Sequence, residues 1–273
     1  MAPSSHIKRW LTAIVALPPL VWILFERSGV FFLALVAAVS SVAIWEYFGV
    51  FLPQDRKRAI LRRLTAIIAG LCVIGGSWRY GERALFPVLF ATVVVFSVFS
   101  LVLFVGEKSD YDNVSREILC ILYIPALLSS LVLLRRGQDG IVWVVFTIAL
   151  VFAADTGAYY AGSYLGRRKL HPRISPGKTV EGAIGGIAAD IAVGAFFKWH
   201  FFTTLSWPVC VLLCVCAAVV GQAGDLFESL LKRSAGVKDS GSLLPGHGGI
   251  LDRIDALLFT APLVYWFKLI MEG

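Results

Sequence analysis

The chain has 273 residues, 58% of them apolar, and its mean hydropathy is +0.79. Globular proteins contain about 45–50% apolar residues, so this composition excludes an ordinary soluble domain. The net charge of +7 would suggest nucleic acid as the partner of a soluble protein. In an apolar chain it is better explained by membrane topology and anionic lipid. We therefore expect a protein of the lipid bilayer that binds no nucleic acid.

Apolar runs recur along the whole chain, and many approach the ~20 residues that a helix needs to cross the hydrocarbon core. Because they are continuous and not alternating, they favour helices over a β-barrel. We predict an all-α, polytopic membrane protein that forms a single domain, with apolar helices in 1–135 and catalytic helices and loops in 140–273. The nine predicted spans are Ile7–Phe25, Val30–Leu52, Ile60–Ser77, Leu85–Val105, Ile118–Leu134, Ile141–Leu165, Gly182–Phe197, Leu205–Leu231 and Ile254–Ile270.

The basic residues divide unevenly between the two sides of this topology. With the N-terminus inside, 18 of the 25 Lys and Arg residues fall in inside segments and 7 in outside segments. Because Lys and Arg favour cytoplasmic loops, the loops 166–181 and 232–253 are predicted to face the cytoplasm. We expect the protein in a bacterial inner membrane, with these loops on its cytoplasmic side.

Among the first five predicted spans, Glu46 is the residue that needs an explanation. An ionisable group inside a span is costly and is by default a functional hypothesis. No motif surrounds Glu46, so a structural pairing role stays equally open.

Polar motifs begin in the sixth span, where Asp155 precedes a stretch of small residues. Small residues allow helices to pack closely and are also compatible with a homodimer, which the sequence leaves open. A basic loop and the run Ser175–Gly182 follow. Gly177-Lys178-Thr179 within it is not a P-loop, because the earlier glycine and a preceding strand are missing. It nevertheless places Lys178 beside a helix N-terminus, where phosphate can bind.

Carboxylates recur on the last two spans. Asp225 lies near the end of the eighth span, and Asp252 and Asp255 stand three residues apart at the start of the ninth, on one helix face. A hairpin of these two helices would bring the three acids together. Oxygen ligands of this kind suit Mg²⁺, Mn²⁺ or Ca²⁺. The alternatives are separate buried acids with their own basic partners, or acids that balance a helix dipole.

The segment between these two spans, 229–255, is too polar and too long for a plain connection, which takes about 2–8 residues. It holds four basic residues, three carboxylates, one histidine and five glycines. Glycines let backbone approach a phosphate, and the cations would neutralise it, although the positive-inside rule also explains basic residues here. The combination indicates a metal–phosphate site.

The same segment resembles the signature of the CDP-diacylglycerol synthases, also called phosphatidate cytidylyltransferases. That pattern is Ser-x-apolar-Lys-Arg, a gap of four, Lys-Asp, a small residue, Pro-x-His-Gly-Gly and Asp-Arg-x-Asp, and every position is met between Ser229 and Asp255. With the run Ser175–Gly182, the resemblance covers about 155–255. It implies CTP and phosphatidic acid as substrates, CDP-diacylglycerol and pyrophosphate as products, and Mg²⁺ as cofactor, alone or with a second cation.

Site residues follow from the residue chemistry and this resemblance together. We assign metal binding to Asp225, Asp252 and Asp255. The residues expected to act on phosphates and in catalysis are Lys178, Lys232, Arg233, Lys238, Asp239, His247 and Arg253. The residues expected to bind substrate are Asp155, Ser175, Lys178, Thr179, Glu181, Gly248 and Gly249. For His247, donation to a phosphate oxygen and a structural turn remain equal alternatives.

Two other functions fit the sequence less well. A CDP-alcohol phosphotransferase would carry a run that begins Asp-Gly-x-x-Ala-Arg, which is missing. A cation-coupled transporter would use the acids within the spans, and would show broken helices in two repeated halves. Here the polar motifs are confined to the second half of the chain.

Overall fold

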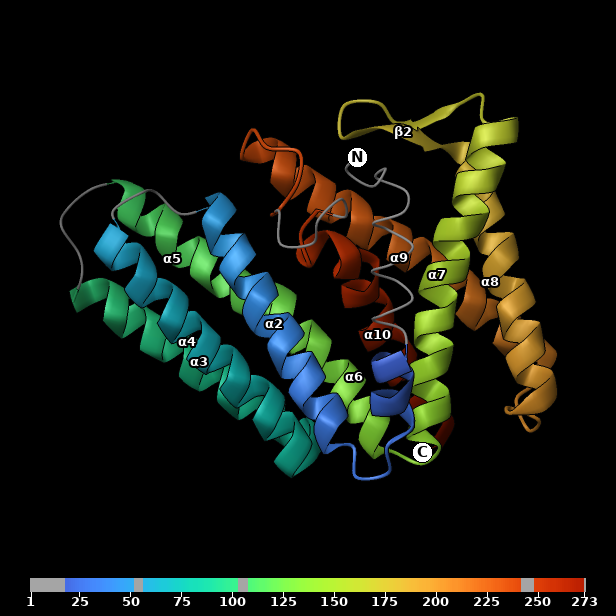
Figure 1. Ribbon diagram of the computed structural model, residues 1–273, viewed down its shortest axis with the longest axis horizontal. Coiled ribbons are helices and arrows are strands. Elements are labelled where there is room, and N and C mark those ends of the chain that lie inside the picture. The colour runs from blue at the N-terminus through green and yellow to red at the C-terminus, as the bar shows by residue number, and fades with distance from the viewer. Residues whose placement is uncertain (1–17, 52–55, 103–107, 242–247, 273) are drawn as a thin grey trace, which may run out of the picture. The chain divides into compact units, whose positions relative to one another are not determined.

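The computed structural model describes residues 18–51, 56–102, 108–241 and 248–272 and is almost entirely helical (Figure 1). It confirms the predicted class of an all-α, polytopic membrane protein. Residues 18–25 are also helical. The elements are α2 (Val30–Phe51), α3 (Arg56–Tyr80), η1 (Gly81–Ala84), α4 (Leu85–Val102), α5 (Lys108–Ile121), η2 (Leu122–Ala126), α6 (Leu127–Arg136), α7 (Gly140–Leu165), β1 (Lys169–His171), β2 (Ser175–Thr179), α8 (Val180–His200), α9 (Trp207–Ser234) and α10 (Leu251–Glu272).

Seven helical stretches among the described residues are long and apolar enough to cross a membrane. One of them, Ile60–Val98, covers the predicted span Ile60–Ser77 and most of the predicted span Leu85–Val105. The short 3₁₀ helix η1 divides it, Gly81 has a φ of 73° there, and α3 packs against α4. The predicted run Ile7–Phe25 lies mostly outside the described residues, so the count of nine stays a prediction.

The chain forms two compact units, which we call the first and second unit. The first comprises Met1–Arg136 with Asp239–Arg253, and the second comprises Gly137–Lys238 with Ile254–Gly273. The part of the signature segment from Asp239 to Arg253 therefore belongs to the same unit as the apolar N-terminal helices. The prediction of a single domain stays a prediction.

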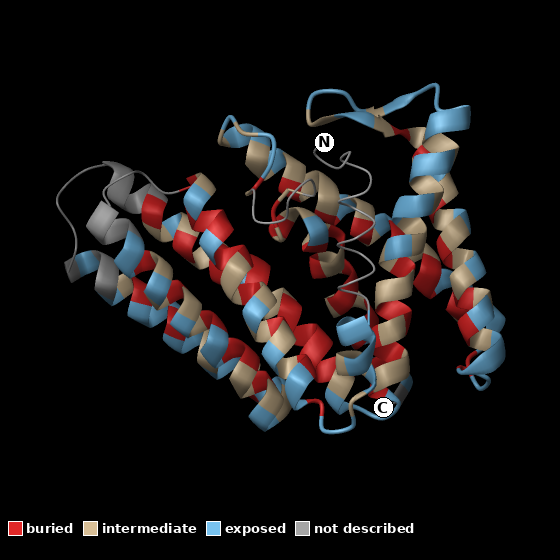
Figure 2. Cartoon of the chain, viewed as in Figure 1, coloured by how far each residue is buried: buried red, intermediate tan, exposed pale blue. Residues whose placement is uncertain are grey.

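The core of the first unit is formed where α2 packs against α3 and α6. Ile44, Tyr47 and Phe48 on α2 are buried there, and Figure 2 shows buried residues along the contacting helix faces. An ion pair between Arg62 on α3 and Glu117 on α5 is also buried. Burying one of these charges alone would be costly, so the pair holds the two helices in one register.

In the second unit, α7 and α8 approach each other through glycines. A Cβ added to Gly157 would lie 2.6 Å from the carbonyl oxygen of Gly185, and one added to Gly185 would lie 2.3 Å from the Cβ of Ala161. No side chain fits at these distances, which confirms that the small residues serve close helix packing. The possible homodimer is not tested by these contacts.

The loop predicted after the sixth span is in fact an antiparallel hairpin of β1 and β2, with Lys169 opposite Thr179. Pro and Gly are depleted in strands, and β2 contains Pro176 and Gly177, so the sequence did not suggest a strand. The hydroxyl of Thr179 accepts from the N–H of Gly182 at 3.1 Å and caps α8. This cap satisfies one donor of the helix end that the sequence suggested was free for phosphate.

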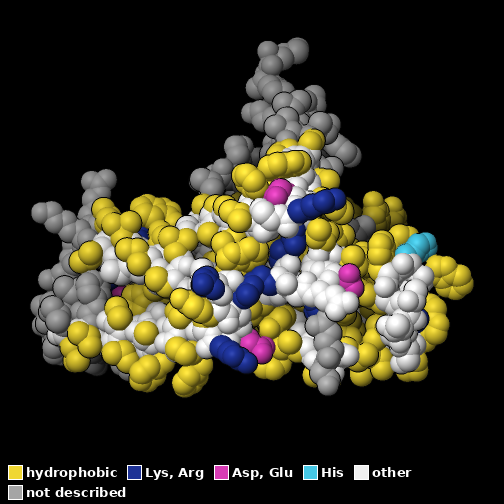
Figure 3. Space-filling model, turned by 90° about the horizontal axis from the view of Figure 1, so that it is seen from below, with side chains coloured by type: hydrophobic (Ala, Val, Ile, Leu, Met, Phe, Trp, Pro, Cys, Tyr) yellow, Lys and Arg dark blue, Asp and Glu magenta, His cyan; other side chains and the backbone are white. Residues whose placement is uncertain are grey.

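Large apolar side chains cover much of the outside of both units. Phe86 is 79% exposed in the first unit, and Tyr164 and Ile270 are 82% and 76% exposed in the second. Figure 3 shows a face on which most side chains are hydrophobic. Apolar area of this extent is stable next to lipid tails and not in water, so the protein is an integral membrane protein.

Candidate active site

Four aspartates gather in the second unit, one from each of its long helices. Asp155 lies on α7, Asp190 on α8, Asp225 on α9 and Asp255 on α10. Asp255 interacts electrostatically with Asp225, Asp155 and Lys178, and Asp190 with Asp155. Carboxylates this close repel each other unless cations lie among them, so the cluster is suited to bind positive charge.

Lys178, near the end of β2, brings a positive charge to this cluster. Its ammonium group forms an ion pair with Asp225, and both side chains are about one-quarter exposed, at 26% and 28%. The hydroxyl of Ser229 also donates to Asp225, at 3.5 Å. A partly exposed pair of this kind can exchange partners when a phosphate or a metal ion arrives.

The hairpin is held so that Lys178 reaches the cluster. The carboxylate of Glu181, in the first turn of α8, accepts from the N–H groups of Arg167 and Arg168 at 3.0 and 3.1 Å. Glu181 and Thr179, both assigned to substrate, therefore organise the hairpin in this structure. Their contact with substrate stays a prediction.

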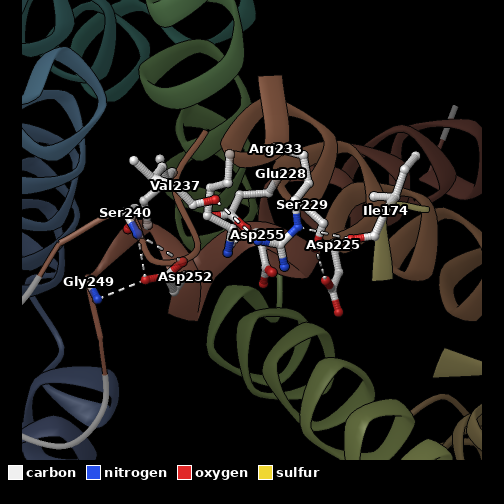
Figure 4. A network of polar contacts seen from close by, with 12 residues as sticks. Ile174, Asp225, Glu228, Ser229, Arg233, Val237, Ser240, Gly249, Asp252 and Asp255 are labelled. Atoms are coloured by element: carbon white, nitrogen blue, oxygen red, sulfur yellow. Dashed lines mark hydrogen bonds and ion pairs between the residues drawn. The ribbon is translucent and has the colours of Figure 1, made fainter. Parts of the chain in front are cut away.

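Asp225 and Asp255 come together because α9 and α10 pack closely at Gly224. A Cβ on Gly224 would lie 2.8 Å from the carbonyl oxygen of Asp255 and 3.0 Å from the ring of Phe259. The side chain of Asp255 accepts from the N–H of Ala256 at 2.7 Å. Figure 4 shows the carboxylates of Asp225 and Asp255 in this part of the molecule.

Asp190 is the member of the cluster to which the sequence assigned no role. Its side chain is buried, with the residue 1% exposed, and its Oδ1 atom has no hydrogen-bond partner among the described residues. The available signal was an acid within an apolar run that also contains glycines. That signal did not show which helix face, and hence which partners, Asp190 would have.

The basic residues at the end of α9 form hydrogen bonds and an ion pair within the protein. Arg233 donates from Nε to the carbonyl of Ile174 at 3.3 Å and from a terminal nitrogen to that of Val237 at 3.2 Å (Figure 4). Lys232 pairs with the buried Glu228 one turn earlier. Arg233 thus links the end of α9 to the β1–β2 loop, which orders the surface around Lys178.

Asp252 belongs to the first unit, and its carboxylate organises the segment before α10. It accepts from the N–H of Gly249 at 2.8 Å and from that of Ser240 at 3.1 and 3.3 Å (Figure 4). Gly248 has a φ of 78°, and a Cβ there would lie 2.9 Å from Oδ2 of Asp252. These two glycines therefore let the backbone turn against Asp252, and their contact with substrate stays a prediction.

The remaining predicted site residues differ in exposure. Lys238, Asp239 and Arg253 are exposed. Ser175 is half-buried and pairs with His171 across the hairpin. His247 lies outside the described residues.

The residues present fit a magnesium ion in part. No group of three or more His, Cys, Asp or Glu side chains in the described part of the chain is arranged to hold a metal ion by itself. Mg²⁺ at nucleotide sites is typically bound by only one or two carboxylates together with substrate phosphates. Asp225 and Asp255 satisfy that requirement.

The apolar helices and the acidic cluster with its lysine define an integral membrane protein with a polar centre suited to cations and phosphates. Residues 7–271 match the cytidylyltransferase family. The chain therefore belongs to the cytidylyltransferase family and is a nucleotidyltransferase, which confirms the resemblance seen in the sequence.

Three relatives of known name illustrate the similarity. The phosphatidate cytidylyltransferase of Synechocystis sp. is 31% identical over 97% of both chains. That of Bacillus subtilis is 39% identical over 68% of this chain and 66% of its own. That of Brucella suis is 48% identical over 50% of this chain and 51% of its own.

Proposed function

We propose that the protein is a phosphatidate cytidylyltransferase of phospholipid biosynthesis, which converts CTP and phosphatidic acid into CDP-diacylglycerol and pyrophosphate. The observation that carries this is the similarity to the Synechocystis enzyme over 97% of both chains, with the signature from Ser229 to Asp255 complete. The membrane setting supports it, because the lipid substrate can keep its acyl chains in the bilayer.

In the proposed reaction, an oxygen of the phosphatidic acid phosphate attacks the α-phosphorus of CTP. A new phosphorus–oxygen bond forms, the bond from the α-phosphorus to the bridging oxygen breaks, and pyrophosphate leaves with that electron pair. A phosphomonoester carries a charge of about −1.5 to −2 at neutral pH, so the nucleophile needs no strong general base. The barrier comes from bringing two anions together, which positioned cations lower.

Lys178 is placed to supply part of that charge. It pairs with Asp225 and its side chain is 26% exposed, so it can contact a phosphate without leaving the cluster. Three basic residues are proposed to act on phosphates: Lys232 near the end of α9, Lys238 after α9, and Arg253 in the first turn of α10. Arg233 is proposed to keep the end of α9 ordered.

We propose that Asp225 and Asp255, with Asp252 on the first turn of the same helix, hold the magnesium ion. The bound ion would supply charge neutralisation for the substrate phosphates and the leaving pyrophosphate. The gathering of these carboxylates around the ion pair of Lys178 with Asp225 supports this assignment. A second cation and a homodimer stay predictions.

The catalytic side is proposed to face the cytoplasm of a bacterial cell, where CTP is found, which is supported by the excess of basic residues on that side. Ser234 is exposed at the end of α9 and allows a test. In a cysteine-free protein that carries Ser234→Cys, an impermeant thiol reagent added outside intact cells should not label it. Labelling from outside would show the opposite orientation.

The activity itself is tested on the purified protein by measuring CTP consumption and formation of the CDP-lipid, with and without EDTA. We expect turnover that requires phosphatidic acid and a divalent cation. Equal consumption of CTP without phosphatidic acid would refute the proposed substrate.

A further inference from the structure

Glu46 is a buried acid in the apolar first half of the chain, 7% exposed on α2. Its carboxylate accepts three hydrogen bonds, all from the segment Asp239–Arg253 of the first unit. The donors are the N–H of Ile250 at 3.0 Å, the N–H of Leu251 at 2.9 Å and the hydroxyl of Ser240 at 3.4 Å. A residue some 200 positions away along the chain thus fastens this segment to α2.

Two of these donors belong to the start of α10, which begins at Leu251. The first N–H groups of a helix have no acceptor within the helix, and negative charge at that end is favourable because of the helix dipole. Glu46 therefore caps the N-terminal end of α10 from another helix, whereas an N-cap residue does so from the adjacent position in the chain. The same helix carries Asp252 and Asp255.

The segment also passes unusually close to this carboxylate. A Cβ on Gly249 would lie 2.5 Å from Oε2 of Glu46, and one on Gly241 would lie 2.7 Å from Oε1. These glycines admit the backbone to hydrogen-bonding distance of Glu46, which is a physical reason for glycine at both positions independent of any phosphate.

Ser240 connects Glu46 to Asp252. Its hydroxyl donates to Glu46, and its N–H donates to the carboxylate of Asp252. The position of Asp252 therefore depends on a chain of contacts that ends on α2.

We propose that Glu46 is a positioning residue for catalysis: it holds the start of α10, and through Ser240 the Asp252 carboxylate, in the geometry that the reaction needs. This inference rests on the proposed function. A displacement of about 1 Å at a catalytic group can cost about 100-fold in rate, so the predicted effect is on turnover more than on fold. Glu46 itself does not touch substrate.

The test compares Glu46→Gln with Glu117→Gln in the full-length protein purified in detergent. Glu117 is the matched control, because it is a buried acid of the same unit, paired with Arg62 and not with this segment. For each variant, kcat and the KM values for CTP and phosphatidic acid are measured together with the thermal unfolding midpoint. Tryptic cleavage after Lys238 and after Arg253, both exposed, reports on the segment without reference to activity.

We expect Glu46→Gln to lower kcat by about 10- to 100-fold, with a smaller change in both KM values, and to speed cleavage after Lys238 and Arg253. Glu117→Gln should lower the unfolding midpoint as much or more, yet leave cleavage at these two sites and kcat within about twofold of wild type. Equal loss of kcat in both variants, or wild-type kcat in Glu46→Gln, would overturn the proposal.

If Glu46→Gln does not fold, the variant Gly241→Ala tests the positioning role instead. The added methyl group would press on Oε1 of Glu46, so kcat should fall, and Glu46→Asp should restore part of it by making room. Normal kcat in Gly241→Ala would overturn the proposal. If the wild-type protein fails to use CTP and phosphatidic acid, the proposed function is wrong. Unchanged tryptic cleavage in Glu46→Gln would refute the positioning role independently of that result.

Discussion

Two buried acids of the first unit, Glu46 and Glu117, and the four clustered aspartates of the second unit differ in the partners they have. In the first unit, Glu46 accepts from two backbone N–H groups and a hydroxyl, and Glu117 pairs with Arg62. In the second unit, four aspartates interact with one another while Lys178 is the cation paired with one of them. The first two acids are paired with donors of the protein, although Oε2 of Glu117 has no hydrogen-bond partner among the described residues, whereas the second arrangement is proposed to receive further positive charge.

This difference separates residues that build the site from residues that do the chemistry. Neutralising a satisfied acid should change position or stability, because it removes an existing contact. Neutralising an acid in the second cluster should change ligand binding, if a bound cation completes its contacts as proposed. The following predictions test that distinction.

The largest effect is expected for Asp255→Asn, which removes one of the two clustered carboxylates proposed to hold the metal. Activity should fall at least about 100-fold, the scale for loss of a group that stabilises transition-state charge, and EDTA should abolish wild-type turnover. Asp139→Asn is the control, since Asp139 is exposed in the same unit and its left-handed backbone is tolerated by Asn. Wild-type turnover in Asp255→Asn at ordinary Mg²⁺ would contradict the metal assignment.

A somewhat smaller effect is expected for Lys178→Ala, which removes the cation of the cluster. Loss of a charge-assisted contact to phosphate costs roughly 1.5–3 kcal/mol, or about 10- to 150-fold in kcat/KM for CTP. Lys169→Ala is the control, because Lys169 is an exposed lysine on the other strand of the hairpin. Comparable loss in the two variants would show that hairpin charge in general, and not Lys178, is what matters.

Lys238→Ala should lower CTP turnover at least about tenfold and leave expression and melting unchanged, because Lys238 is exposed. Lys238→Arg should recover part of the activity, since a planar fork replaces a point charge. If Lys238 served only to keep the segment on the cytoplasmic side, Arg would restore full activity. Kinetic assays on the two variants distinguish these outcomes.

The smallest effect on turnover is expected for Asp190→Asn. Asp190 is buried, and one of its oxygens lacks a hydrogen-bond partner among the described residues, so an amide relieves charge repulsion and desolvation. The unfolding midpoint should not fall, and activity should fall less than in Asp255→Asn. Loss equal to that of Asp255→Asn would place Asp190 among the metal ligands.

Much of this protein could be inferred without coordinates. Apolar runs near the bilayer length predicted most of its helices, because lipid requires each span to satisfy its own backbone. The signature between Ser229 and Asp255 predicted the family, which the match over residues 7–271 confirms. The small residues of α7 predicted close helix packing, which the approach of Gly157 to Gly185 confirms.

Contacts between residues far apart in the sequence could not be predicted from the sequence. Glu46 lay in an apolar span without a motif, and only the fold of the first unit shows that it caps α10 through Ile250 and Leu251. Likewise, only helix packing shows that Asp190 joins the cluster of the second unit, and only the hairpin shows how Lys178 meets Asp225. Local periodicity and residue chemistry determine which segments are helices and which groups are reactive, whereas contacts between distant segments depend on side-chain packing that no local pattern encodes.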